Sequence, residues 1–266
     1  MNQRSGGAFW AIVLIVIGGV FLLQNLGILT RNAWGAIWPL FLILLGAWLL
    51  LGNFVRRSHI ATRTQAVPLD GAREARLSLN HGAGHLTLRP TSDPTTLVSS
   101  TFDGELVSTV RRDGDRLEVR QSQERDWTFW MWPGNWGTRF DWRLSVNREI
   151  PMAVDLHTGA SRVDIDLREL KVTDFKLDAG ASTVDVMLPA SGQVTARIKA
   201  GAATVRVHVP QGIAAHVRGV VGAGSVNVDT TRFPRRNDAY QSPDYDTAAN
   251  RVELHFEGGA ATFNVM

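Results

Sequence analysis

The pattern of apolar and polar positions along this chain repeats around a Gly-Ala pair. The pair begins at residues 82, 159, 180, 201, 222 and 259, and the copies from 159 to 222 start 21 residues apart. Positions −5, −3, +4 and +6 from each glycine are almost all apolar, as in Phe175, Leu177, Val184 and Val186 around Gly180. This alternation predicts two short strands per copy, each with one buried face.

A constant period of this size is typical of a stacked β architecture in which each repeat forms one rung. The glycine between the two arms is expected to supply a positive φ or a close backbone approach to the next rung. We therefore predict an all-β domain, a β-solenoid of stacked short strands. An antiparallel sandwich of similar hairpins is the alternative, although sandwiches rarely keep one period over several strands.

The outward positions support stacking because their charges alternate in sign between copies. If successive copies lie side by side, three acidic residues meet three basic ones: Asp155 and Lys176, Asp178 and Lys199, and Asp185 and Arg206. Cross-strand pairs of opposite charge favour such a register. Each exposed pair is worth only about 0–1 kcal/mol, so the pairs indicate register more than stability.

The first 55 residues have a different composition. Residues 9–29 and 33–54 are almost wholly apolar, and about 20 helical residues span a bilayer. We predict a transmembrane helical hairpin, held in a lipid bilayer. A cleaved signal peptide is the alternative, but the first segment is long, lacks a small-x-small cleavage site and is followed at once by a second apolar segment.

Positive charge flanking the two segments predicts the orientation. The basic residues nearest the segments are Arg4 before the first, Arg31 between the two, and Arg56, Arg57 and Arg63 after the second. The positive-inside rule then places both termini, and the β domain, in the cytoplasm. We expect a linker at 56–68 and the repeat β domain at 69–266.

Two segments interrupt the repeat. Residues 124–142 form a Trp-rich insertion that holds five of the nine tryptophans: Trp127, Trp130, Trp132, Trp136 and Trp142. These rings either cover the open side of the stack or form an exposed tip that contacts the membrane interface or a partner. Strands are expected on both sides, at 95–102, 105–122 with a turn at Asp113-Gly114, and 139–150. Residues 232–250 are expected to form a long polar loop.

The sequence offers little catalytic chemistry. It contains no cysteine and carries a net charge of only +3, which argues against a thiolate site and against dedicated nucleic-acid binding. His81 and His85 have the spacing of metal ligands, and Arg235 with Arg236 has the composition of an anion site, but isolated pairs of this kind are more often structural or solvated. No phosphate loop, nucleophile elbow or HExxH motif is present. We predict a protein that is not an enzyme and needs no cofactor.

The apolar segments contain GGVFLLQNLGIL and WPLFLILLGAWLLL, and the Gly-Ala repeats that follow end close to the C-terminus. This arrangement resembles the LiaF-like family of bacterial membrane proteins, and the repeat half resembles the toast-rack, or adhesin-like, β domains of cell-wall-active antibiotic response proteins. The resemblance implies a role in the cell-envelope stress response, in which the protein restrains a membrane-bound histidine kinase of a two-component system. It implies no catalytic residues.

The expected function is therefore that of a membrane-anchored regulator or scaffold that docks a sensor kinase or another membrane protein. The candidate contact residues are the five tryptophans and a basic column on neighbouring rungs, Lys176, Arg197 and Arg218, which would face an acidic protein surface or anionic head groups. An unpaired edge strand is expected to permit a homo-oligomer. The alternatives are an adhesin-like or structural envelope protein with an extracytoplasmic β domain, and a polysaccharide-binding or hydrolytic β-helix.

Overall fold

The computed structural model describes residues 62–104, 106–123 and 141–266, which all belong to one compact unit. The described residues contain strands and loops and no α-helix, so the prediction of an all-β domain is confirmed. Within these residues no helix is long and apolar enough to cross a membrane. The predicted hairpin at 9–29 and 33–54, and Trp127, Trp130, Trp132 and Trp136, lie outside the described residues.

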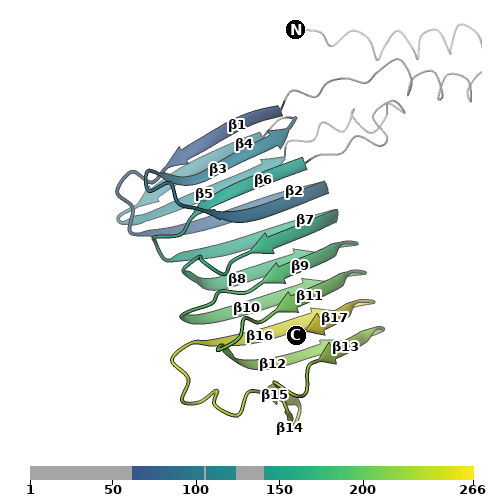
Figure 1. Ribbon diagram of the computed structural model, residues 1–266. Helices are drawn as coiled ribbons and strands as arrows, with labels where there is room; N and C mark the ends of the chain where they lie inside the picture. The colour runs from purple at the N-terminus through teal and green to yellow at the C-terminus, as the bar shows by residue number, and fades with distance from the viewer. Residues whose placement is uncertain (1–61, 105, 124–140) are drawn as a thin grey trace, which may run out of the picture. The chain divides into compact units, whose positions relative to one another are not determined.

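The described residues form seventeen strands, whose arrangement is shown in Figure 1. They are β1 (Thr62–Pro68), β2 (Glu74–Thr91), β3 (Thr96–Asp103), β4 (Leu106–Asp113), β5 (Arg116–Gln123), β6 (Asp141–Asn147), β7 (Met152–Asp166), β8 (Val172–Ala179), β9 (Thr183–Met187), β10 (Gln193–Ala200), β11 (Thr204–His208), β12 (Ala214–Val221), β13 (Ser225–Val228), β14 (Arg235–Arg236), β15 (Ala239–Gln241), β16 (Arg251–Gly258) and β17 (Thr262–Val265).

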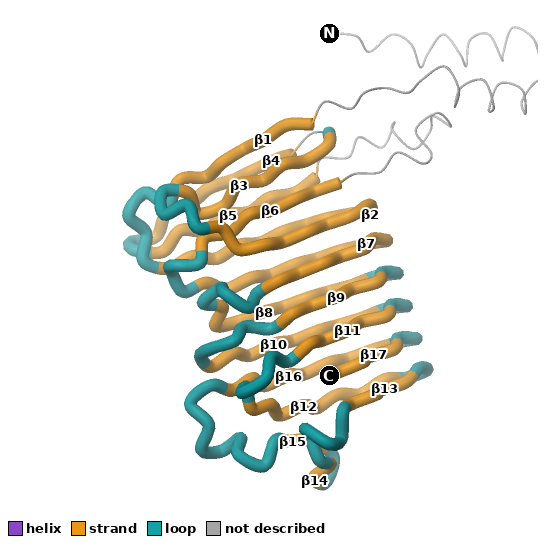
Figure 2. The backbone as a smooth tube through the Cα atoms, in the orientation of Figure 1, coloured by secondary structure: helices purple, strands orange, loops and turns teal. Residues whose placement is uncertain are grey.

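The strands form two ladders that share the long strands β2 and β7. The first ladder runs β4, β5, the first half of β2, the first half of β7, β8, β10, β16, β12, β15 and β14. The second runs β1, β3, β6, the second halves of β2 and β7, β9, β11, β17 and β13. Figure 2 shows them as two layers joined by short turns along one edge. We call the two arms on either side of a Gly-Ala turn a rung, named by its glycine, and the row of turns the glycine edge.

The apolar slots predicted from the sequence fill the space between the layers. In the inner rungs these side chains are excluded from solvent: Leu156, Val163, Phe175, Leu177, Val184, Val186, Ala196 and Val205 are all at 0% exposure. They join a single hydrophobic cluster with the equivalent residues of the other rungs. Only the Gly222 rung departs from the pattern, because its Val226 and Val228 are half-buried.

The glycines of the turns lie one above another at very short range. A Cβ atom added to Gly159 would lie 2.4 Å from the carbonyl oxygen of Gly82, and one on Gly180 would lie 2.8 Å from that of Gly159. Neither glycine has a positive φ. Of the two reasons expected for glycine, close approach therefore applies here and left-handed backbone does not.

The order of the rungs differs from the order of the sequence at the C-terminal end. β10 pairs with β8 on one side and with β16 on the other, and β16 then pairs with β12. The Gly259 rung is thus inserted between the Gly201 and Gly222 rungs. An added Cβ on Gly219 would lie 2.2 Å from the ring of Phe256, so the glycine makes room for that ring. Arg218 on β12 therefore does not lie beside Arg197 on β10, as the predicted basic column on neighbouring rungs requires.

The segments outside the repeat lie at the two ends of the stack. The predicted hairpin around Asp113-Gly114 is confirmed as β4 and β5, with Gly114 at a φ of 60°. Residues 62–68, expected to be linker, form β1 instead and pair with β3. The expected loop at 232–250 contains the short strands β14 and β15.

Candidate functional site

The outward side chains of the first ladder form a surface that we call the charged face. It comprises Asp155, His157, Asp174, Lys176, Asp178, Arg197, Lys199, Arg218, Glu253, His255 and Glu257, which come from β7, β8, β10, β16 and β12. The period-two alternation of each strand directs them outward because the alternate positions are buried in the core. Acidic and basic residues are interspersed over the whole face.

The predicted basic column is interrupted on this face. Lys176 lies beside Arg197 in the register, but His255 stands between Arg197 and Arg218 because of the inserted rung. Lys176 Nζ lies 3.7 Å and Arg197 Nη1 3.2 Å from the two carboxylate oxygens of Asp174. Arg218 forms no ion pair with the residues that the structure describes. The three cations are therefore not a continuous stripe of positive charge.

The three predicted cross-strand pairs all lie directly opposite one another in the register. Only Asp185 and Arg206 form the expected ion pair, at 3.2 Å. His157 instead bridges two carboxylates, with Nε2 3.2 Å from Asp155 and Nδ1 3.0 Å from Asp178. Lys199 pairs with Glu257 at 3.1 Å. The sequence therefore predicted the register correctly. The ion pairs differ because Asp155 and Asp178 contact His157, and Lys199 contacts Glu257 of the inserted rung.

A second histidine, His255, contacts a carboxylate of the charged face, that of Glu253. His255 Nε2 lies 2.9 Å from Glu253 Oε1. This hydrogen bond, with smaller contributions from His216 and Arg197, holds the pKa of Glu253 below its ordinary value. Glu253 is therefore ionised throughout the physiological pH range and neutralises the cations around it.

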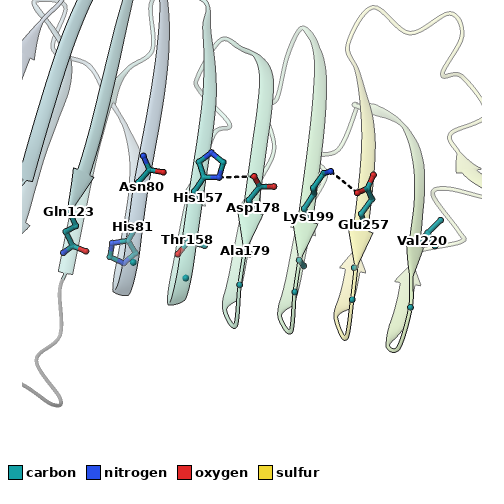
Figure 3. A pocket seen from close by; sticks show the side chains of 18 residues that line it. Asn80, His81, Gln123, His157, Thr158, Asp178, Ala179, Lys199, Val220 and Glu257 are labelled. Carbon is teal, nitrogen blue, oxygen red and sulfur yellow. Dashed lines mark ion pairs between the residues drawn. The ribbon is translucent and has the colours of Figure 1, made fainter. Parts of the chain in front are cut away.

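A shallow groove of about 1210 Å³ runs across the rungs between the charged face and the glycine edge (Figure 3). The turn glycines line one side, and the other side carries one residue from each rung: Asn80, His157, Asp178, Lys199, Glu257 and Val220. Figure 3 shows two ion pairs along this row, His157 with Asp178 and Lys199 with Glu257. Lys199 and Glu257 neutralise each other, and His157 contacts the carboxylate of Asp178, so the groove is not lined by charges of a single sign.

The outer face of the second ladder carries carboxylates as well. His85 Nε2 lies 2.6 Å from Asp164, which is 27% exposed. Asp166, whose side chain is only 9% exposed, accepts hydrogen bonds from Arg168 Nε and Nη2 at 2.9 Å and 2.7 Å. These bonds, together with Arg168 and Arg89 as nearby cations, lower the pKa of Asp166. Asp166 therefore holds the turn that follows β7.

The histidine pair and the arginine pair that were weighed as metal and anion sites lie in the following surroundings. His81 is 2% exposed and its ring centroid lies 5.9 Å from that of Trp142, whereas His85 contacts Asp164. Over the described ranges, no three His, Cys, Asp or Glu side chains group in a way that would hold a metal ion. Arg235 and Arg236 form the exposed strand β14.

Trp142 is buried, whereas a residue that contacts a partner must be exposed. It is 0% exposed, and it pairs with Leu86 and Phe102 inside the second ladder. For this tryptophan the interpretation as part of the packed structure is therefore the correct one. Its place at an inward slot of β6, two residues before the apolar Leu144, was the signal in the sequence.

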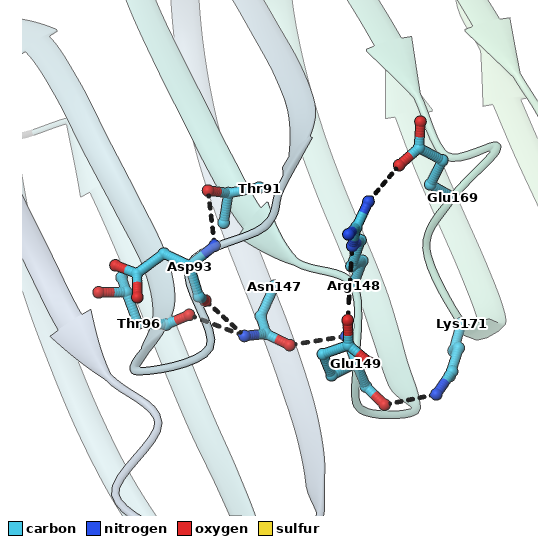
Figure 4. Close-up of polar contacts among 8 residues, drawn as sticks. All are labelled: Thr91, Asp93, Thr96, Asn147, Arg148, Glu149, Glu169 and Lys171. Atoms are coloured by element: carbon cyan, nitrogen blue, oxygen red, sulfur yellow. Dashed lines mark hydrogen bonds and ion pairs between the residues drawn. The ribbon is translucent and has the colours of Figure 1, made fainter.

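The edge opposite the glycine turns is organised by a polar network that sequence reasoning did not identify (Figure 4). Asn147 is fully buried, and its Nδ2 donates to the backbone oxygens of Asp93 and Thr96 at 3.0 and 3.1 Å. Its Oδ1 accepts from Glu149 N at 2.7 Å. The network fixes the loops between β6 and β7 and before β3.

A second part of this edge is held by ion pairs and by an exposed carboxylate. Arg148 binds Glu169 at 2.9 Å across neighbouring rungs. Hydrogen bonds from the side chain and backbone of Thr95 lower the pKa of Asp93 to about 2. These contacts stabilise the turns along this edge.

Two family models match the chain. Residues 56–208 match the model described as the N-terminal domain of toast_rack, DUF2154, and residues 8–50 match the model described as the LiaI-LiaF-like transmembrane region. The second match supports membrane association of the protein. No curated protein matches the chain.

Solved structures resemble the chain as well. A candidate cell adhesion protein from Clostridium sporogenes ATCC 15579 has 20% sequence identity and a TM-score of 0.67, covering 77% of this chain and 98% of its own. This likeness shows the adhesin-like β fold. A candidate adhesin from Bacteroides fragilis NCTC 9343 has 7% identity and a TM-score of 0.28, covering 77% and 97%, a score too low to carry an argument.

The toast-rack model covers more than half of the chain, and the membrane-region model covers much of what precedes it. The chain therefore belongs to the toast-rack family, as a LiaF-like membrane protein with a toast-rack β domain.

Proposed function

We propose that this protein is a membrane-anchored, non-enzymatic regulator of the cell-envelope stress response, which modulates a membrane histidine kinase through its β domain. The observation that carries the proposal is the joining of a LiaI-LiaF-like membrane region and a toast-rack domain in one chain. A ladder of stacked rungs with a continuous dry core is rigid, which suits a surface that docks a partner.

The charged face is the proposed docking surface. Its signs alternate along the row nearest the glycine edge, from Asp178 to Lys199 to Glu257, and the pairs Lys199 with Glu257 and Arg197 with Asp174 are half-exposed. A partner that offers the complementary alternation would be selected by charge pattern, whereas a uniformly acidic or basic surface would be repelled at every second position. Specificity would therefore come from register.

Residues 9–29 and 33–54 are proposed to form the two-helix anchor, with the β domain in the cytoplasm. Trp127, Trp130, Trp132 and Trp136 are proposed to contact the membrane interface or the kinase, since indole rings favour both settings. Fusions of cytoplasmic and exported reporters to Met266 test the orientation. Activity of only the exported reporter would contradict it.

Charge reversal tests the docking surface. A chain with Lys176→Glu, Arg197→Glu and Arg218→Glu is expected to lose capture of the kinase from detergent-solubilised membranes and to change the output of an envelope-stress reporter. Arg206→Glu on the opposite face is the matched control. If the triple variant captures the kinase and signals as the unaltered chain does, the charged face is not the interface.

An envelope adhesin or structural protein with an extracytoplasmic β domain is the second candidate. The fold likeness to the candidate cell adhesion protein of Clostridium sporogenes favours it. The same reporter fusions to Met266 discriminate the two functions, because an adhesin requires export of the β domain and a cytoplasmic kinase contact does not.

A further inference from the structure

The Gly222 rung, formed by β12 and β13, ends the stack with one side unpaired. On its inner side β12 pairs with β16 along its whole length, but on its outer side only His216 and Val217 pair, with β15. Among the described residues β13 pairs only with β17. Residues 218–221 and 225–228 therefore present two open strand edges of equal length, which meet at the Gly222 turn.

The outer side of this rung is covered over only one half. Far from the turn, Ser242 N donates to Ala215 O at 2.9 Å. Near the turn no described strand covers the rung, as Figure 1 shows below the right-hand ends of β12 and β13. There Val220 is 75% exposed and Val226 is half-buried, whereas the equivalent Val184 is fully buried.

The opposite end of the stack carries the features that normally prevent edge pairing. There β1 ends in Pro68 with an irregular register, and β4 carries Arg111, Arg112 and Asp113 on its exposed edge. Natural edge strands use proline, irregularity and charge in this way. The open edges of the Gly222 rung contain no proline and one charged residue, Arg218. These edges therefore lack the features that block pairing with another strand.

We infer that these edges pair with the same edges of a second copy of this chain, β12 of each copy lying antiparallel to β13 of the other. The backbone fixes the register. Gly222 N donates to Gly258 O, so by alternation the amides of Gly219 and Val221 point away from β16. Ser225 N donates to Ala261 O, just before β17, and Asp229 N donates to Val265 O, so by alternation the amides of Val226 and Val228 also point outward.

The same four residues face the core, which makes the two edges complementary. Val221, Val226 and Val228 pack against the core cluster. Antiparallel pairing of Val221 with Val226 of the second copy, and of Gly219 with Val228 of the second copy, joins outward amides to outward carbonyls and core side chains to core side chains. Because the contact is isologous, each pair forms twice.

The position where the chain enters the domain selects this arrangement over the other two-fold pairing. Thr62, the first residue of β1, lies opposite Asp103 at the end of β3. The preceding residue of β3, Phe102, lies opposite Trp142 of β6, and Trp142 lies opposite Leu86 of β2, four residues after Gly82. The chain thus enters at the glycine edge. Pairing β12 with β13 keeps the glycine edges of both copies on the same side, as two chains anchored in one membrane require; pairing β12 with β12 would put them on opposite sides. This step rests on the membrane anchor.

The interface is small. Four-residue edges bury less than the roughly 800 Å² per partner of a standard stable complex. The dimer is therefore weak in dilute solution and forms when both copies are confined to one membrane, where the effective concentration is high.

Cysteine cross-linking tests the register directly, because the chain contains no cysteine. Val220 lies opposite Asn227 of the second copy in this register, on the outer surface, and Cβ atoms of such pairs approach to about 4.5–5.5 Å. Within one copy these residues point to opposite faces. The full chain with Val220→Cys and Asn227→Cys, oxidised with copper–phenanthroline in native membranes, is expected to give a disulfide-linked dimer.

The matched control moves one cysteine a single rung inward. Asn264 lies beside Asn227 in the register, so Val220→Cys with Asn264→Cys adds about 4.8 Å to the separation, beyond disulfide reach. The 220/227 chain is expected to give about tenfold more linked dimer than this control or either single variant. Equal linking in the control, or no linking in the 220/227 chain with an unchanged proteolysis pattern, overturns the inference.

A blocking variant separates the dimer from the kinase contact. Val226→Pro removes an outward amide without breaking the ladder with β17, since proline is tolerated where the amide faces outward. Added to the 220/227 chain, it is expected to abolish the cross-link. Kinase capture measured on the same chain then shows independently whether the proposed function fails, and persistent linking would contradict the pairing.

Discussion

The inner rungs and the Gly222 rung carry the same motif in different surroundings. GASTVDV at Gly180 and GAGSVNV at Gly222 have apolar residues at the same positions, yet Val184 is fully buried and Val226 is half-buried. The inner rung has neighbours on both sides, at Val163 and Val205, whereas among the described strands Val226 lies beside Phe263 alone. In this fold a rung is completed by its neighbours, so the motif alone does not determine burial.

The glycine column is expected to give the largest difference between the two regions. Gly159→Ala would place a Cβ 2.4 Å from a backbone oxygen, whereas Gly222→Ala would place it 3.3 Å from one. Because the backbone of the rungs must separate, Gly159→Ala is expected to destabilise the protein by about 3 kcal/mol and Gly222→Ala by less than about 1 kcal/mol. Urea unfolding of the full chain in detergent, followed by tryptophan fluorescence, measures both. Equal losses would mean that the column is not tightly packed.

A matched pair of valines gives the next largest effect. Val184→Ala removes two buried methyl groups and leaves a cavity between two rungs, which costs about 2 kcal/mol. Val226→Ala at the same position of the last rung is expected to cost about 1 kcal/mol or less, because its side chain is already half in water. The same unfolding assay compares them, and a larger loss for Val226→Ala would indicate that the end of the stack is covered.

The sequence predicted the rungs well and their order only in part. Apolar alternation located both arms of every copy, because burial of one face requires it. The position of the Gly259 rung was missed because strand order does not follow from repeats once a segment as long as 229–250 intervenes. The complementary sizes of Gly219 and Phe256, at the same slot of two copies, were the available signal.

The candidate site was predictable in register but not in contacts. Asp178 and Lys199 lie opposite one another as expected, but each has another neighbour of opposite charge, and side-chain geometry decides between them. Asn147 was missed because a polar residue at the end of a strand looks like part of a loop. Its burial depends on the carbonyls of Asp93 and Thr96, which are distant in sequence.

An aspartate stands seven residues after the turn glycine in both regions, Asp166 in the Gly159 rung and Asp229 in the Gly222 rung. The pH dependence of stability compares the two. Hydrogen bonds from Arg168 lower the pKa of Asp166 from its ordinary value of 3.8. A lowered folded-state pKa gives stability that is present above about pH 4 and is lost as the pH falls through the lowered value. Asp166→Asn is expected to cost about 2 kcal/mol at neutral pH.

The control for this prediction is Asp229→Asn, which replaces the charged acceptor of one hydrogen bond, from Thr231 N at 3.0 Å, by a neutral amide oxygen that still accepts, and is expected to cost about 1 kcal/mol or less. Unfolding measured at several pH values between about 6 and 3 should show the Asp166→Asn difference shrinking as the pH falls, because the unaltered chain loses the same contacts on protonation. A difference that stays constant with pH would show that Arg168 acts on Asp166 only through packing.

The smallest expected difference concerns the outward pairs five residues after the glycine. Asp185 and Arg206 form an ion pair at 3.2 Å between inner rungs, and Asn227 Nδ2 donates to Asn264 Oδ1 at 2.9 Å at the end of the stack. Double-mutant cycles to alanine should give coupling energies below about 1 kcal/mol for both, since both pairs are exposed to water. Salt separates them: raising the ionic strength from about 0.05 to 0.5 M screens the ion pair and leaves the amide pair unchanged. If both couplings respond equally to salt, the Asp185–Arg206 contact does not hold the register by charge, and the stacked backbone alone fixes it.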